Sequence, residues 1–267
     1  MTRLRLHVLD LGRLRLASRV LVGEGPSLFA DEVEVPVSAY CIEHPEGRVL
    51  FDTGCHPAAM GPEGRWSAAF QRDYQHLGGT ACTLPNRLAE LGLGPDDFRH
   101  VVLSHLHSDH AGCAEFFRRS AIIVHADELA AAQAAYRRKE DDAYSWRDID
   151  SWTKVDLHWQ AVGAAEGDRD IHGGIRLLNF GPGHAFGMLG LRLDLPESGR
   201  IILVSDALYC AENFATDPVL PGWMEDRTGY LGTIARIRAI SAGAAVWFGH
   251  DPRQFATLRT SAQGCYE

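Results

Sequence analysis

The sequence has no long apolar run, and no stretch approaches the roughly 20 residues that a membrane-spanning helix needs. The early residues TRLRLHVLDLG also lack the apolar region of a secretory signal. These two absences predict a soluble cytoplasmic protein without a membrane partner.

Linkers and paired cysteines are missing as well. No Pro/Gly/Ser-rich or low-complexity segment divides the 267 residues, so we expect a single domain over residues 1–267. The six cysteines are scattered and form no CxxC pair, which favours reduced thiols over a disulfide framework. Apolar residues make up 46% of the chain, which is enough for a sizeable core.

The sequence has fewer positively than negatively charged residues. The 26 Lys and Arg residues are outnumbered by 35 Asp and Glu residues, which gives a formal net charge of −9. A nucleic-acid surface needs clustered Lys and Arg to neutralise phosphates, so we expect no nucleic-acid partner. The sequence also lacks a GxSxG motif, so no serine nucleophile of that kind is indicated.

The most informative segment that is present is HLHSDH, from His105 to His110. Imidazole and carboxylate side chains are common ligands of zinc and iron. His105 and His107 alternate with Leu106, so on an extended backbone their side chains project to the same side. The segment follows FRHVVLS, which is predicted to be a buried strand, and metal ligands often lie in loops at strand ends.

Three further metal-binding side chains follow apolar runs later in the chain. His184 comes after IRLLNF, Asp206 after RIILVS and His250 after AAVWF. One such residue would be typical of an ordinary strand end, but four such positions in order predict a single metal centre. The ligands must meet, which is a second reason to expect one domain.

Hydrophobic periodicity predicts the elements around these residues. His56 to Leu84 is expected to be irregular, and the aromatic-rich stretch 140–162 to cover the site, contact a second subunit or pack within the chain. Helices are predicted at Pro85–Leu91, Gly112–Arg119, Ala126–Lys139 and Gly229–Ser241. Strands are predicted at Arg3–Leu9, Val33–Glu43, Arg48–Asp52, Val101–Ser104, Ala121–His125, Ile175–Phe180, Met188–Leu193, Arg200–Val204 and Ala244–Phe248.

The order HxHxDH, His, Asp, His resembles the metallo-β-lactamase superfamily. The resemblance implies an α/β fold, a four-layer αβ/βα sandwich with a two-metal site at one edge. It also implies that Asp52 supports the site from outside the ligand set, although a plain turn carboxylate explains Asp52 equally well. The implied ligands are His105, His107 and His184 for one metal ion, Asp109, His110 and His250 for the other, and Asp206 as the bridge between them.

The likeness narrows to one branch of that superfamily. Asp206 stands where the zinc enzymes that open β-lactams commonly place a cysteine, which argues against that activity. Tyr209 is placed as in the N-acyl homoserine lactone lactonases, the quorum-quenching enzymes, which HPEGRVLFDT, LNFGPGHAFGMLGL and GCYE also resemble. Ser108 departs from that pattern, because relatives often carry a larger apolar residue there. The resemblance further implies a homodimer.

The branch implies a mechanism in which a hydroxide that bridges two divalent metal ions attacks the lactone carbonyl. Tyr209 would donate a hydrogen bond to the carbonyl oxygen as it becomes an oxyanion. Asp109 would carry the proton of the attacking water to the departing alkoxide. Zinc is the expected metal, although iron, cobalt and manganese tolerate the same ligands.

The acyl chain of such a substrate needs an apolar groove. Leu14 and Leu16 alternate in GRLRLASRV, Val20 follows, and the resemblance implies that this segment lines the cleft. A β-hairpin that packs on the core explains the same pattern, and the sequence leaves both open. Phe186, two residues after His184, is a further candidate for the cleft wall.

Two other substrates stay open. The same ligand set serves lactonases for another ring, such as 4-pyridoxolactone, and thioesterases of the glyoxalase II type. The acidic ring of 4-pyridoxolactone would need cationic contacts, whereas the apolar LRL stretch favours an acyl tail. Tyr209 and GCYE fit the lactonases better than the thioesterases. A redox role of the flavodiiron kind would replace one histidine with a carboxylate, and here the histidines are intact.

Overall fold

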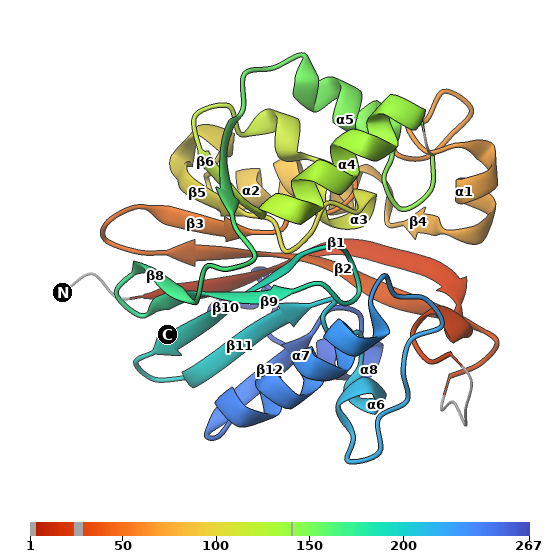
Figure 1. The fold of residues 1–267 in the computed structure, drawn as a ribbon. Coiled ribbons are helices and arrows are strands. Elements are labelled where there is room, and N and C mark those ends of the chain that lie inside the picture. Colours follow the sequence, from red (N-terminus) through yellow and green to blue (C-terminus); the bar gives the residue numbers. More distant parts are fainter. Residues whose placement is uncertain (1–3, 24–28, 140) are drawn as a thin grey trace.

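The computed structural model describes residues 4–23, 29–139 and 141–267, and its strands form two stacked sheets (Figure 1). The first sheet has seven strands in the order β4-β1-β2-β3-β5-β6-β7, and the second has five in the order β12-β11-β10-β9-β8. Helices cover the outer face of each sheet, so the α/β sandwich expected from the sequence is confirmed.

The first sheet comes mainly from the N-terminal half of the chain. Helices α1 (Ala68–Asp73), α2 (Leu84–Glu90), α3 (Ser108–Ala111), α4 (Ala126–Arg138) and α5 (Trp146–Thr153) lie on its side of the molecule. Its strands are β1 (Arg5–Ala17), β2 (Glu32–Glu43), β3 (Arg48–Phe51), β4 (Gln75–Leu77), β5 (Phe98–Val102), β6 (Ala121–His125) and β7 (His158–Val162).

The second sheet comes from the C-terminal half. Its strands are β8 (Arg169–His172), β9 (Ile175–Gly181), β10 (Met188–Leu195), β11 (Gly199–Ser205) and β12 (Ala244–Phe248). Helices α6 (Ala211–Phe214), α7 (Arg227–Ile240) and α8 (Pro252–Phe255) lie on its side. No helix in the described ranges combines the length and the apolar character needed to cross a bilayer.

Alternation along the strands divides the buried side chains into three layers. In β11, Ile201 and Leu203 pack between the two sheets, whereas Ile202 and Val204 pack towards α7. The first sheet likewise buries one face against the second sheet and the other against its own helices, where Ala132 of α4 lies. Successive strand side chains point to opposite faces, so the near-continuous apolar strands are buried on both sides.

The direction of the strands positions the site. β3 and β5 pair in parallel, and so do β11 and β12. Parallel neighbours end at the same edge of a sheet, so the turns that follow them meet there. Those turns carry Asp52, His105, Asp206 and His250.

Most predicted elements are confirmed to within a few residues at each end. The first strand is longer than expected and runs on to Ala17, while Arg3 lies outside the described residues. Its register shifts at a bulge between Asp10 and Arg13. The bulge needs glycine at position 12, because φ is 93° there and a Cβ would lie 2.2 Å from the Leu77 carbonyl oxygen. The GRLRLASRV segment is therefore one arm of a long β-hairpin with β2.

The helix predicted at Gly112–Arg119 is wrong. Instead, α3 ends at Ala111 and a single 3₁₀ turn follows at Ala114–Phe116. The Thr53 N–H donates to the His110 carbonyl at 2.6 Å, and the Gly112 N–H donates to the Gly54 carbonyl at 2.9 Å. These long-range bonds occupy backbone groups that a continuous helix would need, so tertiary contacts override the local pattern.

Short elements were also missed. The segment predicted as irregular contains α1 and β4, and the aromatic-rich stretch contains α5 and β7. Tyr144 and Trp152 are buried in the core, and the ring of Tyr144 also lies 4.9 Å from that of His107. The stretch therefore packs within the chain and borders the site, and its contact with a second subunit stays a prediction.

Candidate metal centre and substrate cavity

The loop after β5 delivers four of the expected ligands. His105 lies just beyond the strand, His107 precedes the first turn of α3, and Asp109 and His110 lie within it. The backbone N–H of the intervening Leu106 donates to the carboxylate of Glu128 at 2.9 Å. This buried contact holds the loop that presents the two alternating histidines.

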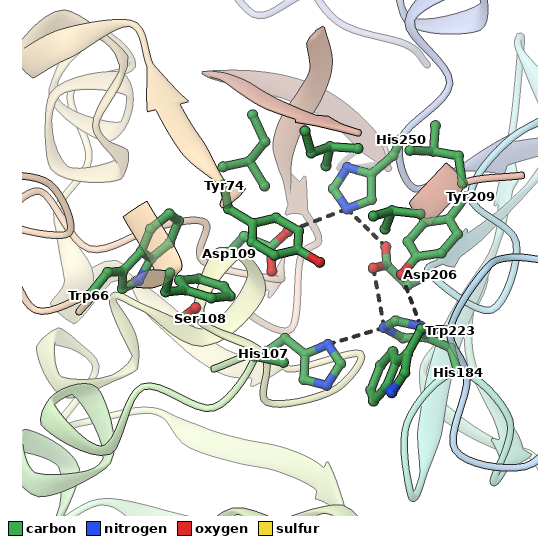
Figure 2. A pocket seen from close by; sticks show the side chains of 16 residues that line it. Trp66, Tyr74, His107, Ser108, Asp109, His184, Asp206, Tyr209, Trp223 and His250 are labelled. Carbon is green, nitrogen blue, oxygen red and sulfur yellow. Dashed lines mark hydrogen bonds and ion pairs between the residues drawn. The ribbon is translucent and has the colours of Figure 1, made fainter. Parts of the chain in front are cut away.

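The other three expected ligands come from the second sheet. His184 lies in the β9–β10 loop, Asp206 directly follows β11, and His250 follows β12. All three side chains are buried and point towards the HLHSDH segment (Figure 2). The structure therefore brings together all seven residues that the sequence singled out.

Asp206 lies at the centre of this cluster. Its Oδ2 faces Nε2 of His184 at 3.4 Å and Nε2 of His105 at 3.8 Å. Its Oδ1 faces Nε2 of His250 at 3.2 Å and Nε2 of His110 at 3.3 Å. The two oxygens of one carboxylate thus serve two different groups of histidines, which is the arrangement that a bridging ligand requires.

The donor atoms fit two divalent cations. Three overlapping sets each place one donor atom per residue within 4.8 Å of the others: His105, His107 and His184; His105, His110 and Asp206; and Asp109, His110 and His250. Nε2 of His105, His107 and His110 and Oδ1 of Asp206 are buried without a hydrogen-bond partner. Buried lone pairs without partners are costly, and a bound cation would satisfy them.

The second ring nitrogen of several histidines has its own partner. Nδ1 of His110 lies 3.0 Å from Oδ2 of Asp52, and Nδ1 of His250 lies 2.8 Å from the Pro36 carbonyl oxygen. Asp52 also accepts from the backbone N–H of Ser104 at 2.7 Å. Such outer contacts fix the tautomer and the orientation of metal-binding imidazoles. Asp52 therefore has the supporting geometry that the family resemblance implied.

Burial and charge divide the histidines into two groups. Burial lowers the pKa of His105 and His107 well below the usual value, and that of His184 to about 4. Burial also opposes charge on His110 and His250, but nearby carboxylates outweigh it and hold the pKa of His110 well above its usual range and that of His250 at about 10. Asp206 is the largest of these influences, so the aspartates draw positive charge to their side of the cluster.

A cavity opens directly onto the cluster (Figure 2). Leu14, Leu16 and Val20 line it, as the sequence led us to expect, so the hairpin is also a cavity wall. Ser108 lines it too, where a larger side chain would take up space. Other lining residues are Leu21, Trp66, Phe70, Tyr74, Ala143, Tyr209 and Trp223.

Phe186 lies elsewhere. It is 42% exposed and lines a neighbouring pocket beside α4, which shares Ala143 and Trp223 with the cavity over the cluster. The backbone that carries Phe186 lies close to β6. At the next residue, Gly187, a Cβ would lie 2.1 Å from Nδ1 of His125.

Several site residues were not found from the sequence. Trp66, Phe70 and Tyr74 recur every fourth residue in a segment too short to be recognised as helical. Trp223 packs its ring 5.5 Å from that of His107 and 5.4 Å from that of His184, but lies in a loop without a pattern. Glu128 follows His125 by three positions in VHADE. Nothing in the sequence indicates that this carboxylate is fully buried on helix α4.

Comparison with known proteins gives the class first. The sequence profile of the metallo-beta-lactamase superfamily matches residues 33–250. Two stacked sheets with a His and Asp cluster at their common edge agree with that match.

Proteins of similar sequence and structure then identify the family within this superfamily. The chain is 42% identical to the N-acyl homoserine lactonase AiiB of Agrobacterium fabrum and to that of Rhizobium rhizogenes, in each case over 98% of this chain and 99% of the relative. A solved N-acyl homoserine lactone hydrolase with N-hexanoyl-L-homoserine at its catalytic metal centre superposes with a TM-score of 0.83 at 28% identity, covering 100% of both chains. The chain therefore belongs to the metallo-beta-lactamase superfamily and, within it, to the family of N-acyl homoserine lactonases.

Proposed function

We propose that this protein hydrolyses the lactone ring of N-acyl homoserine lactones with the help of two divalent metal ions. The observation that carries the proposal is the convergence of seven donor side chains around Asp206, at the floor of a cavity with apolar walls. Full-length similarity to lactonases supports the same substrate class.

The cluster divides naturally into two metal positions. His105, His107 and His184 would hold one ion, Asp109, His110 and His250 the other, and the two oxygens of Asp206 would contact both. Two such ions would polarise the lactone carbonyl and lower the pKa of a bound water towards neutrality. Zinc suits this set of nitrogen and oxygen donors best, and iron, cobalt and manganese tolerate it.

Tyr209 is placed to act on the carbonyl oxygen of the substrate. Its hydroxyl lies 3.1 Å from Nδ1 of His184, whose Nε2 faces the cluster. With Nε2 of His184 holding a cation, Nδ1 would carry the proton and donate a hydrogen bond to the phenol oxygen. The O–H of Tyr209 is then free to donate to the oxyanion that develops, a contribution of about 2.7–4 kcal/mol for one such donor.

Asp109 is placed to move the proton. Its side chain is 16% exposed and lines the cavity, whereas the side chain of Asp206 is only 3% exposed. Asp109 is therefore accessible from the cavity, where the attacking water and the leaving oxygen would both lie. It would accept the proton as the C–O bond forms and return it to the alkoxide as the ring opens.

The cavity walls favour an acyl chain over the alternative substrates. Among the described residues that line the cavity, none is Lys or Arg, and most are apolar or aromatic. An acidic pyridine ring, or a glutathione moiety with two carboxylates, would have to enter without a cationic contact from the lining. An uncharged acyl chain has no such need.

Ring opening releases a proton near neutral pH, so a pH-indicator assay tests the proposal directly. The purified protein, with its metal content measured, is given N-hexanoyl homoserine lactone, 4-pyridoxolactone and S-lactoylglutathione in parallel. We expect turnover of the homoserine lactone and about two metal ions per chain. Hydrolysis of only the thioester would overturn the substrate class, and full activity with a single ion per chain would overturn the two-metal arrangement.

A further inference from the structure

The wall of the cavity opposite Tyr209 is an aromatic column from the α1 region. The ring of Trp66, 1% exposed, meets that of Phe70 edge to face at 5.0 Å. The rings of Phe70 and Tyr74 stack at 4.6 Å with planes 25° apart. Phe70 lies in α1, whereas Trp66 and Tyr74 lie just before and just after it, so the packing of the three rings fixes where the last ring lies.

The backbone holds Tyr74 firmly at the end of this column. Ser67 caps the first turn of α1 by accepting from the Phe70 N–H at 3.1 Å, and the Tyr74 N–H donates to the Phe70 carbonyl at 2.8 Å. The next residue, Gln75, pairs with Arg15 of β1, which carries Tyr74 to the side of the hairpin that holds Leu14 and Leu16.

The hydroxyl of Tyr74 points into the cavity towards the metal cluster (Figure 2). Burial raises the pKa of Tyr74, and the charge of Asp109 is the next contribution, so the phenol lies within the field of that carboxylate. In the part of the chain that the structure describes, this hydroxyl has no hydrogen-bond partner. The hydroxyl therefore faces the cavity as a donor that no described residue occupies, and it is available to a ligand bound there.

The order of groups along the cavity matches the order of groups in the proposed substrate. In Figure 2 the His and Asp cluster lies at one end, the hydroxyl of Tyr74 beside it and Trp66 beyond. The ring of Phe70 packs against both of the other rings. An N-acyl homoserine lactone has a lactone ring, then an amide, then an acyl chain. With the lactone carbonyl at the cluster and Tyr209, the amide comes next to Tyr74.

We propose that Tyr74 is a further substrate-binding residue, whose hydroxyl donates a hydrogen bond to the amide carbonyl of the N-acyl homoserine lactone. The proposal rests on the proposed function and deepens it. Tyr74 selects lactones with an amide at this position over plain alkyl lactones, and it orients the lactone ring against the cluster.

Tyr74→Phe is the decisive variant, because it removes only the hydroxyl and keeps the stacked ring. The kinetic constants kcat and KM are measured with N-hexanoyl homoserine lactone and with γ-decalactone, which has the ring and an alkyl chain but no amide. We expect kcat/KM for the homoserine lactone to fall about three- to tenfold, mostly through KM, as for the loss of one neutral hydrogen bond. The value for γ-decalactone should not change.

Tyr136→Phe is the matched control. It removes a hydroxyl that donates to Asp150 at 2.9 Å between α4 and α5, away from the cavity lining. Both activities should be unchanged in this variant. Calorimetric binding of the ring-opened product, N-hexanoyl homoserine, provides a second measurement, and Tyr74→Phe should weaken it by the same factor.

The outcomes separate the two proposals. If the wild-type protein opens the homoserine lactone but Tyr74→Phe loses nothing, or loses equally on both substrates, the role of Tyr74 is overturned and the proposed function stands. If the wild-type protein opens γ-decalactone but not the homoserine lactone, the proposed function itself falls, and the role of Tyr74 falls with it.

Discussion

The described residues contain two clusters of histidines, and the geometry of only one of these two suits a metal ion. The first is the cluster around Asp206. The second joins His44 and Glu46, in the turn after β2, to His172 at the end of β8 and His100 in β5. His100 lies within β5 and His105 beyond its end, so the same strand leads to both clusters.

Donor spacing does not distinguish the clusters, because one atom each from His44, Glu46 and His172 also lies within 4.8 Å of the others. The orientation of the imidazole rings distinguishes the two clusters. Around Asp206, the ring of His105 crosses those of His107 and His184 at 75° and 86°. The rings of His44 and His172 stack at 4.7 Å with planes only 3° apart.

The lone pair of an imidazole nitrogen lies in the plane of its ring. Rings that cross steeply can direct their lone pairs at a common point, whereas two stacked parallel rings cannot reach one ion unless one of them turns. In addition, Nδ1 of His44 already accepts from the Glu46 backbone N–H at 3.1 Å. Proximity of donors alone therefore does not make a metal site, because the lone pairs of the donors must also converge.

The largest expected effect comes from a comparison in which one histidine is removed from each cluster. His184→Ala should lose bound metal and lower kcat/KM by roughly 10³-fold or more, because the Lewis-acid contribution amounts to several kcal/mol. His172→Ala should retain both the metal content and the activity. Metal analysis by mass spectrometry with the lactonase assay measures both, and loss of metal from the His172 variant would contradict the distinction between the clusters.

The next effect tests the outer contacts of the first cluster. Asp52→Asn keeps the shape of the side chain and suits the left-handed backbone at this position (φ 60°). It removes the charge that faces Nδ1 of His110 at 3.0 Å. We expect metal affinity to fall about ten- to a hundredfold, as is typical of such partners. Titration against a chelator measures it, and unchanged affinity would show that Asp52 is only a turn residue.

The comparison also explains what the sequence could and could not reveal. The candidate ligands were predictable because the order of His and Asp residues after strand-like segments indicates a metal site even without a structure. The orientation of His44 and His172 was not, because stacking depends on how the β2–β3 turn meets β8 across 128 positions of chain. β8 itself was missed, since its four residues RDIH carry too little apolar pattern to be recognised.

Parts of the cavity were hidden for a similar reason. Leu14 and Leu16 show strand alternation, whereas the six residues of α1 are too few to display helical periodicity around Phe70. Helix prediction also failed at Gly112, where backbone contacts with Gly54 decide the conformation. Local patterns therefore located the metal ligands well and the substrate wall poorly.

The stability contributed near the two clusters should change with pH in opposite directions. Glu128 tests this beside the first cluster. Burial raises the pKa of Glu128 to about 7, although it accepts from the Leu106 N–H and the Tyr144 hydroxyl. The folded protein then holds a proton that the unfolded chain releases near pH 4.5. Stability from this group is present below about pH 4.5 and is lost as the pH rises through about 7.

Glu128→Gln resembles the protonated form at every pH, so it should remove that part of the pH dependence. The stability of the wild type relative to this variant should decline between pH 5 and pH 8, by on the order of 3 kcal/mol at most. Thermal unfolding at each pH measures the difference. A constant difference over this range would mean that Glu128 is ionised throughout.

The smallest expected effect concerns the second cluster, where the contribution to stability changes with pH in the opposite direction. Burial lowers the pKa of His172 below 6.5, and the neighbouring His44 adds to this, while Glu46 opposes it. The unfolded chain therefore takes up a proton before the folded protein does. Stability from this histidine is present above about pH 6.5 and declines as the pH falls from there to the folded pKa.

His172→Phe keeps a ring to stack on His44 but cannot be protonated, so it should match the wild type at pH 8 and lose less Tm on acidification, by about one to a few degrees. Release of metal in acid also lowers Tm, but it acts equally on the wild type, on His172→Phe and on the control His158→Phe, which changes an exposed histidine of β7. The difference between the two variants therefore isolates the second cluster. If both variants followed the same acid profile, the stacked histidines would carry no pH-dependent stability, and the contrast between the two clusters would reduce to metal binding alone.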